Sequence, residues 1–264
     1  MVDLSIVIVN YKNREKALNC LRSIYDADFS NYTFEVILID NYSCDEIEET
    51  VADKFPQVNI IQSGANLGMG KGNNVGIEAS KGKYILILNP DTVVEKDAIR
   101  LMCDKFIEND EIGMIGPKLL YPDGVHQYSY FMFPELLMPI YRRTPLGKIM
   151  NNKIDKFLMK GYDIDNEIEV DWLMGSCLLT SRDVIDKVGM FDDRFFMYFE
   201  DTDLCKRIKK INLKVVYYPK AVVYHHHGRA SAEESWYLAP FTNKLARIHI
   251  QSWAKYFWKW KIEN

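Results

Sequence analysis

The chain has 264 residues, of which 48% are hydrophobic and 27% charged, and it carries a formal net charge of −4 at pH 7. This apolar content is enough for one large α/β domain, or for one domain with an appendage, and it excludes a disordered chain. The negative charge gives no overall attraction to nucleic acid, so any basic function must be local. We therefore expect no nucleic-acid partner.

The cysteines and the apolar runs bear on the cellular compartment. Five cysteines, an odd number without any Cys-x-x-Cys pair, disfavour a disulfide framework and a cysteine zinc site and suit a reducing cytoplasm. No stretch approaches the ~20 apolar residues of a membrane-spanning helix, and the apolar run at residues 5–9 lacks the basic flank and length of a signal peptide. We expect a protein that is neither secreted nor integral to a membrane.

Apolar strands and amphipathic helices alternate along the first half of the chain. This alternation predicts an α/β fold with a doubly wound, mainly parallel sheet. One strand is apolar throughout, which is typical of the middle of a sheet covered on both faces. Strands are predicted at residues 4–9, 34–40, 58–61, 84–88 and 112–115, with helices at 14–25, 45–55, 71–80 and 95–107.

The second half of the chain is less regular. Residues 119–167 carry four prolines among aromatic residues and methionines, and we interpret them as a long, partly mobile loop with short helices. Order returns at residues 168–180, and Thr180 or Ser181 can cap the helix that follows. Further helices are predicted at residues 182–188 and 202–210, strands at 214–218 and 221–224, and one long helix at 238–261.

Polar side chains follow three of the predicted strands. Asn10 closes the first strand, Asp40 and Asn41 close the second, and Asn89 and Asp91 close the fourth. Each segment alone is ordinary turn chemistry, but donors and acceptors gathered at one sheet edge suit a nucleotide base and ribose. Asp91 suggests a divalent cation bridging to phosphate, because ligands bind at the carboxyl ends of such strands. The alternative is that Asp91 opens a turn or caps the next helix.

A glycine-rich segment, residues 66–76, resembles a dinucleotide fingerprint only superficially. Its glycines miss the required spacing because position 73 is Asn, and it follows the third strand rather than the first. A Rossmann dehydrogenase is therefore disfavoured. The segment suits a flexible loop whose backbone amides and helix start approach phosphate, with Asn73 and Asn74 as side-chain donors. The alternative is a plain glycine-rich connector.

An acidic cluster, residues 200–203, follows the aromatic run 191–199. The helix dipole keeps carboxylates ionised at a helix N-terminus, and an ionised carboxylate in an aromatic-walled cleft can accept a proton from a hydroxyl. The alternative is helix capping by Thr202 or Asp203, which explains one acid but not three.

Three consecutive histidines end the last predicted strand. Alternate residues of a strand share a face, so His225 and His227 lie together and His226 lies opposite. Neutral imidazoles there can complete a mixed Asp/His site for a divalent metal. A structural histidine is the alternative.

The C-terminal helix alternates aromatic residues with lysines and arginines, and Glu263 is the only acid after Glu234. That composition is typical of an interfacial helix lying on an anionic membrane. The alternative is a helix docked on its own domain with a solvated basic face.

In their order along the chain, these motifs resemble the inverting glycosyltransferases of the family-2 type, with the GT-A fold, and most of all the rhamnosyltransferase branch. The resemblance covers about residues 3–231. It rests on seven ordered blocks: Ile6–Tyr11, Asp40–Ser43, Asn66–Gly68 with Gly72–Gly76, Leu88–Thr92, Asp171–Ser176, Phe199–Leu204 and His225–Gly228.

The resemblance implies a donor site and a metal site. Asp91 would bind Mn²⁺ or Mg²⁺, with Asn89 where many relatives carry another aspartate. That departure leaves one fewer carboxylate and makes His225 and His227 more attractive as further metal ligands. The residues expected along the nucleoside, ribose and phosphate path are Asn10, Tyr11, Asp40, Asn41, Asn66, Gly68, Asn73, Asn74 and Asn89.

The resemblance also implies the catalytic residues. Asp201 would be the base that deprotonates the acceptor hydroxyl, with Glu200 as its acidic neighbour, and a single displacement would invert the anomeric centre. Trp172, Gly175 and Ser176 would line the acceptor side. The implied organisation is a GT-A domain at residues 1–231, with a nucleotide-binding half (1–117) and an acceptor-binding half (118–231), followed by a basic aromatic helix at 232–264.

The resulting expectation is an enzyme that moves L-rhamnose from dTDP-L-rhamnose to a lipid-linked oligosaccharide. We expect it at the cytoplasmic face of a bacterial membrane, as a peripheral protein attached by the C-terminal helix. One alternative keeps the fold but uses a UDP-hexose donor. Another is a nucleotide-sugar or glycan-binding module without turnover, against which the presence of both Asp91 and Asp201 argues. A nucleotidyltransferase is disfavoured because no basic glycine-rich loop follows the first strand.

Overall fold

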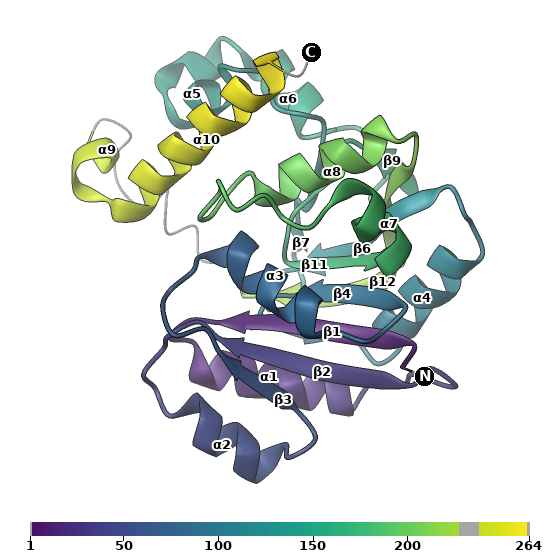
Figure 1. The fold of residues 1–264 in the computed structure, drawn as a ribbon. Coiled ribbons are helices and arrows are strands. Elements are labelled where there is room, and N and C mark those ends of the chain that lie inside the picture. The colour runs from purple at the N-terminus through teal and green to yellow at the C-terminus, as the bar shows by residue number, and fades with distance from the viewer. Residues whose placement is uncertain (1, 227–237, 263–264) are drawn as a thin grey trace.

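The computed structural model describes residues 2–226 and 238–262, and it is built around one large twisted sheet (Figure 1). In the described residues, the order of strands across the sheet is β3 (Asn59–Gln62), β2 (Phe34–Asp40), β1 (Leu4–Asn10), β4 (Tyr84–Leu88), β11 (Cys177–Ser181), β6 (Ile112–Leu120), β12 (Lys214–His225) and β5 (Thr92–Val94). Two short strands extend it, β7 (His126–Gln127) beside β6 and β9 (Ile168–Val170) beside β12. A separate small sheet pairs β8 (Tyr130–Phe131) with β10 (Trp172–Leu173).

Most of the long pairings are parallel, as the alternation of elements predicts. β2 is parallel to β1 and β3, β1 to β4, and β6 to β12. β11 is antiparallel to both of its neighbours, β4 and β6. Its first residue, Cys177, therefore pairs with Leu88 at the end of β4, so the segment before β11 arrives at the edge where the parallel strands end.

Helices cover both faces of the sheet, which confirms the doubly wound architecture. Buried side chains of α1 (Arg14–Tyr25), α2 (Ile47–Lys54) and α4 (Ala98–Ile107) pack on one face with alternate residues of β1 and β2. On the other face, Ile77 of α3 (Met69–Ala79), Ile185 of α7 (Arg182–Val188) and Leu204 of α8 (Glu200–Lys210) share a second cluster with the opposite side of β1 and β4. Strand β4 is buried along its whole length, as predicted.

The structure corrects several predicted boundaries. The helix expected from residue 95 begins at Ala98, because residues 92–94 form a strand that pairs with β12. The two strands expected at 214–218 and 221–224 are one strand with an irregularity between Tyr218 and Val222. The stretch 119–167 contains α5 (Met138–Arg143), a short 3₁₀ helix (Pro145–Lys148) and α6 (Asn151–Phe157) besides β7 and β8.

The predicted C-terminal helix is two helices. α9 (Ala239–Thr242) ends before Asn243, whose side-chain oxygen accepts hydrogen bonds from the backbone of Leu245 and Ala246 and so caps α10 (Lys244–Ile262). Tyr256 and Trp260 of α10 pack against phenylalanines of the segment before α8. This face of the helix is docked on its own domain, as the alternative interpretation held.

Two further expectations concern the whole chain. None of the five cysteines forms a disulfide, as predicted. Among the described residues, no helix combines the length and apolarity needed to cross a membrane. The division of the chain at residues 117 and 231 stays a prediction.

Candidate active site

The polar strand ends converge on one edge of the sheet. Asn10 at the end of β1 pairs with Asp40 at the end of β2, and Leu88 of β4 lies beside both Ile8 of β1 and Cys177 of β11. The four strand termini are therefore consecutive neighbours. This confirms the prediction that the side chains following the first, second and fourth strands come together.

The termini of β1 and β2 form a buried polar layer. The side-chain amide of Asn10 donates to Ser43 Oγ (3.1 Å), and the backbone N–H of Ser43 donates to Asp40 Oδ1 (3.1 Å). The other side-chain atom of Asn10, Oδ1, is buried and has no hydrogen-bond partner in the described part of the chain. Because an unsatisfied buried carbonyl oxygen is costly, this atom indicates a place for a donor supplied by a ligand.

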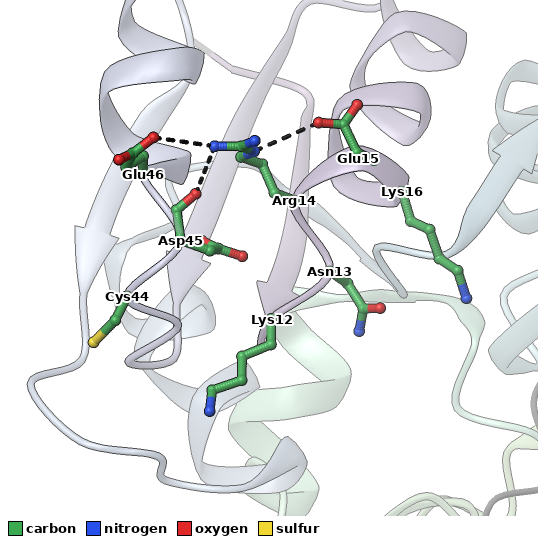
Figure 2. Close-up of a pocket in the computed structure, with 8 residues that line it drawn as sticks. All are labelled: Lys12, Asn13, Arg14, Glu15, Lys16, Cys44, Asp45 and Glu46. Carbon is green, nitrogen blue, oxygen red and sulfur yellow. Dashed lines mark hydrogen bonds and ion pairs between the residues drawn. The ribbon is translucent and has the colours of Figure 1, made fainter.

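A surface hollow of about 530 Å³ opens beside this layer (Figure 2). It lies between the segments that follow β1 and β2. Its lining carries three basic side chains and three acidic ones, namely Lys12, Arg14, Lys16, Glu15, Asp45 and Glu46. Arg14 is held by Glu46 and by the carbonyl of Asp45. Tyr11, predicted to contact the nucleoside, lies next to the hollow in the chain with an exposed ring. The place of this hollow, at the ends of β1 and β2 and beside an aromatic ring, suits a nucleotide.

Asn41, Asn66 and Gly68 form one hydrogen-bonded unit. The side-chain oxygen of Asn41 accepts from the backbone of Leu67 (2.9 Å), and its amide donates to Asn66 Oδ1 (3.2 Å) and to the Gly68 carbonyl (3.1 Å). These residues are brought together as the sequence predicts. Their side-chain bonds shape the loop that borders the site.

The glycine-rich segment is mostly helix and is packed rather than open. The backbone N–H of Met69 donates to the Phe196 carbonyl (2.8 Å), and a Cβ at Gly68 would overlap that same carbonyl. Most of the segment expected as a flexible loop is therefore helix, and residues 191–196 cover the helix start. The approach of its backbone amides to phosphate stays a prediction. Asn74 is engaged as well: its amide donates to Phe191 O (2.8 Å) and Asp193 Oδ1 (2.9 Å). Asn73 is buried, and its place on the phosphate path stays a prediction.

Asp91 and His225 meet at the ends of β4 and β12. Their atoms Oδ1 and Nε2 are 3.3 Å apart, and the backbone N–H of His226 donates to the Asp91 carbonyl. Burial would raise the pKa of Asp91, but the hydrogen bond with His225 and the charges of His225 and Lys16 outweigh it and lower that pKa. Asp91 is therefore a carboxylate at neutral pH. It does not cap α4, which starts at Ala98.

The surroundings of this pair fit a divalent cation. Gln127 Oε1 lies 2.7 Å from His225 Nδ1; since that oxygen only accepts, Nδ1 donates to it, and this contact turns Nε2 toward Asp91. The buried Oδ1 atom of Asn89, two residues before Asp91, has no hydrogen-bond partner among the described residues. Over residues 2–226 and 238–262 there is no cluster of three His, Cys, Asp or Glu side chains, so further ligands would come from elsewhere. His227, the third predicted ligand, lies outside the described residues.

Glu200 and Asp201 are partly buried in the first turn of α8, and Glu200 Oε2 is fully buried. Asp201 Oδ2 accepts from the backbone of Gly175 (2.9 Å), and its Oδ1 accepts from the backbone of Thr202 (2.7 Å). Burial raises the pKa of Asp201, and these hydrogen bonds oppose the rise. Burial, together with the charge of Asp201, raises the pKa of Glu200 to about 8. Glu200 is therefore a neutral acid beside Asp201 at pH 7.

The acceptor-side residues connect the two acidic centres. The Ser176 carbonyl accepts from the backbone of Asn89 (2.9 Å), and Gly175, one residue earlier, holds Asp201. Asp201 and Asp91 thus lie at the same edge of the sheet although 110 positions separate them in the numbering. Ser176 Oγ is buried without a partner among the described residues. Trp172 is partly buried, its ring stacked on Phe131 (4.5 Å between centroids).

The structure adds two features that the sequence did not reveal. Gln127 orients His225, but it sits on a two-residue strand within the stretch interpreted as a loop. Asp203 is not a helix cap: it is buried in an ion pair with Lys259 of α10. No local pattern marks either residue, because both partners are distant in sequence.

Comparison with known proteins identifies the family. The N-acetylglucosaminyl-diphospho-decaprenol L-rhamnosyltransferase of Mycobacterium tuberculosis is 30% identical over 75% of this chain and 68% of its own length. The rhamnosyltransferase WbbL of Escherichia coli K12 is 29% identical over 97% of this chain and 93% of its own. Among solved structures, the mannosyltransferase PcManGT from Pyrobaculum calidifontis in complex with GDP-Man and Mn²⁺ has a TM-score of 0.63 and 15% identity, over 96% of this chain.

That mannosyltransferase is longer, and the match spans 64% of its chain. It shows the same fold, which confirms the GT-A architecture expected from the sequence motifs. The model of glycosyl transferase family 2 matches residues 5–189, a segment that holds the donor-side edge, Asp91 and the Gly175–Ser176 connection. On these grounds, the chain is a glycosyltransferase and belongs to glycosyl transferase family 2.

Proposed function

We propose that this glycosyltransferase moves L-rhamnose from dTDP-L-rhamnose to a hydroxyl group of a lipid-linked saccharide, with inversion at the anomeric carbon. The names of two relatives support the sugar, and the decaprenol-linked substrate named for the mycobacterial relative supports the class of acceptor. Such a reaction belongs to the synthesis of bacterial surface polysaccharides.

The observation that carries this proposal is the connection between the two acidic centres. Asp201 is held by Gly175, and Ser176 is hydrogen-bonded to Asn89 beside Asp91. A carboxylate that can take a proton and a carboxylate that can hold a cation then face one substrate site. Inverting transfer needs this pair, because the acceptor must lose a proton while the leaving diphosphate gains negative charge.

Asp201 acts as the base. Hydrogen bonds from two backbone N–H groups fix its carboxylate and favour the charged form, so the acceptor hydroxyl meets an oriented proton acceptor. Glu200 stays protonated beside it, which avoids a second buried charge. Asp91 and His225 would hold Mn²⁺ or Mg²⁺, and the bound ion supplies charge neutralisation of the leaving diphosphate.

The donor lies along β1 and β2. Asn10 Oδ1 offers a buried acceptor to the nucleobase, and Lys12 and Lys16, which line the adjoining hollow, can balance the charge of the diphosphate. The donor site is completed along this edge of the sheet by Asp40, Asn41, Asn66 and Asn73. Thymine and uracil present the same N3–H donor, so a UDP-hexose remains the alternative donor for this site. A binding module without turnover is the weaker alternative, because it has no use for Asp201.

Thermal unfolding with a panel of donors tests the proposal. dTDP-rhamnose, dTDP-glucose, UDP-glucose and GDP-mannose are each added with and without Mn²⁺, because a ligand that binds only the folded state raises the melting temperature. We expect a Mn²⁺-dependent rise with dTDP-rhamnose above all the others. A larger rise with a UDP-sugar would transfer the assignment to that donor, and no rise with any sugar nucleotide would contradict the proposed function.

The location we propose is the cytoplasmic face of the cell membrane, where the protein is peripheral. The outer stripe of α10, formed by Arg247, Ile250, Trp258, Lys261 and Ile262, is exposed, whereas Tyr256 and Trp260 face the domain. These five residues share one side of the helix because their spacings are close to whole turns. Apolar and basic side chains without an acid on that side suit an anionic lipid surface.

A further inference from the structure

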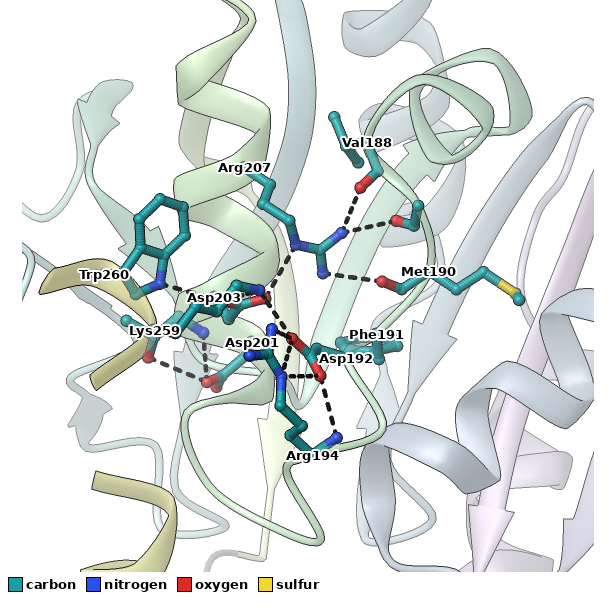
Figure 3. Close-up of polar contacts among 12 residues, drawn as sticks. Val188, Met190, Phe191, Asp192, Arg194, Asp201, Asp203, Arg207, Lys259 and Trp260 are labelled. Atoms are coloured by element: carbon teal, nitrogen blue, oxygen red, sulfur yellow. Dashed lines mark hydrogen bonds and ion pairs between the residues drawn. The ribbon is translucent and has the colours of Figure 1, made fainter. Parts of the chain in front are cut away.

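A lysine of the C-terminal helix is buried beside the catalytic acids. Lys259 of α10 is 5% exposed, and its Nζ lies 2.7 Å from Asp203 Oδ1 and 2.8 Å from Asp192 Oδ2 (Figure 3). The indole N–H of the next residue, Trp260, donates to Asp203 Oδ1 (3.1 Å). One end of α10 is thereby joined to two acidic residues on either side of the segment that leads into α8.

Asp203 has a second cationic partner, Arg207, one turn further along α8. Arg207 Nε lies 2.9 Å from Asp203 Oδ2, and its other nitrogens donate to the carbonyls of Val188 and Met190. The Asp203 side chain is completely buried. Asp192 has its own second partner, Arg194. A buried carboxylate is stable only when it is paired and hydrogen-bonded, so losing Lys259 would remove one donor from the fully buried Asp203 and break the ion-pair link between Asp203 and Asp192.

The segment between these two acids has an unusual backbone. Tyr198 and Phe199 both adopt positive φ angles, 70° and 68°, immediately before Glu200. Non-glycine residues keep this conformation only when the surroundings enforce it. α10 supplies those surroundings: Ser252 Oγ donates to the Met197 carbonyl (2.8 Å), and Tyr256 packs against Phe199.

We propose that Lys259 is a positioning residue for glycosyl transfer. Its ion pairs with Asp203 and Asp192 hold the first turn of α8, so that Asp201, two residues before Asp203, keeps its hydrogen bonds to Gly175 and Thr202. The proposal rests on the proposed function only in naming Asp201 as the base. The bond network itself is independent of the donor and acceptor.

Hydrogen–deuterium exchange tests the structural half of the proposal in the full chain. Lys259→Met keeps the length of the side chain and removes its charge, and Lys244→Met makes the same change at an exposed position of the same helix. We expect residues 198–204 to lose protection in K259M and not in K244M, while β1 and β2 stay protected in both. Unchanged protection of residues 198–204 in K259M would overturn the proposal.

Steady-state kinetics test the functional half, with dTDP-rhamnose and a short-chain prenyl-diphosphate saccharide. A displaced base lowers turnover without weakening donor binding, so we expect kcat to fall about 10- to 100-fold in K259M at unchanged donor KM. Lys259→Arg, which keeps the charge, should keep most of the turnover that K259M loses. An unchanged kcat in K259M, or a kcat loss matched by an equal loss of folded protein, would overturn the proposal.

A second variant covers the case in which K259M does not fold. Trp260→Phe keeps the aromatic packing and removes only the N–H bonded to Asp203. We expect a smaller fall in kcat than in K259M, again at constant donor KM. A wild-type kcat in W260F would then overturn the proposal. If the wild-type enzyme turns over no rhamnosyl donor, the proposed function fails, whereas the exchange comparison still upholds or overturns the positioning role.

Discussion

Glu200 is a buried acid with one oxygen, Oε2, that has no hydrogen-bond partner in the described residues. Its pKa rises from the ordinary 4.5 to about 8 because burial and the charge of Asp201 both oppose ionisation. A neutral Glu200 leaves Asp201 as the single charge of the pair. The two adjacent carboxyl groups are therefore suited to different tasks at neutral pH, which fits the proposed role of Asp201 as the proton acceptor.

This assignment predicts a dependence of stability on pH. Between pH 4.5 and about 8 the folded state holds a proton on Glu200 that the unfolded state has released, so the free energy of unfolding falls as pH rises through that window. Since one pKa unit corresponds to about 1.4 kcal/mol, the contribution is on the order of a few kcal/mol. Glu200→Gln cannot ionise, so the free energy of unfolding of this variant, measured with urea, should fall less between pH 4.5 and about 8 than that of the wild type. Parallel pH profiles for the variant and the wild type would show that Glu200 is not a buried neutral acid.

At the scale of single residues, prediction from sequence succeeded where a residue's role follows from its place in an element. Asp91 and His225 were expected together because both end strands of one sheet, and they are together. Gln127 was missed because its role depends on a contact across 98 positions. Asn74 was expected to approach phosphate, yet its amide holds residues 191 and 193, which follow it by more than 100 positions.

Among the elements, helix α3 lies unusually close to the sheet. Gly76 faces the central strand β1, where a Cβ would overlap Val7 Cγ1, and at Gly72 a Cβ would lie 3.0 Å from Val9 Cγ1. Two of the glycines in the segment that suggested a phosphate-binding loop, Gly72 and Gly76, are thus required by helix–sheet packing.

Gly76→Ala should therefore destabilise the protein. Alanine favours a helix by roughly 1 kcal/mol over glycine, but overpacking a stiff, buried valine costs about 1–3 kcal/mol, and the second effect should prevail. Urea unfolding measures the difference, with Glu78→Ala at an exposed position of the same helix as the control. Adding Val7→Ala should restore part of the loss. A stabilised G76A would mean that α3 can move away from β1 at little cost.

The helices and longer strands were mostly predictable, because hydrophobic periodicity and helix-capping residues are local signals in the sequence. Ser181 was a predicted cap of α7, and its Oγ accepts from the backbone of Val184. The short strands β5, β7 and β9 were not predicted, since they exist only through pairing with β6 and β12. For the same reason the antiparallel β11 could not be distinguished from a parallel strand.

In the whole molecule, α10 lies at the periphery of the fold (Figure 1), with one side packed and the other exposed. Its inner side carries Lys259 and Trp260 against the segment that leads into α8, and its outer stripe is free of acids. The sequence predicted the composition of this helix but not the division of its residues between the two sides. That division depends on which partners the rest of the fold presents.

The outer stripe can be tested without disturbing the inner side. Trp258 is 69% exposed and Ile262 67% exposed, so Trp258→Ser with Ile262→Ser should leave thermal unfolding unchanged. Removing two large apolar side chains should weaken sedimentation with anionic phosphatidylglycerol vesicles at least about tenfold. Ile107→Ser, at an exposed position at the end of α4, is the matched control. If the double variant sediments with the vesicles as strongly as the control variant and the wild type, this would argue against a membrane role for α10.

The most direct measurement is rhamnosyl transfer by Asp201→Asn compared with the wild type, together with binding of dTDP-rhamnose to both. The substitution keeps the shape of the side chain and removes the proton acceptor, so transfer should fall by a factor on the order of 10²–10⁴ while the donor raises the melting temperature of both proteins equally. A variant that transfers rhamnose at the wild-type rate, or one that loses donor binding but keeps its turnover, would contradict the assignment of Asp201 as the base.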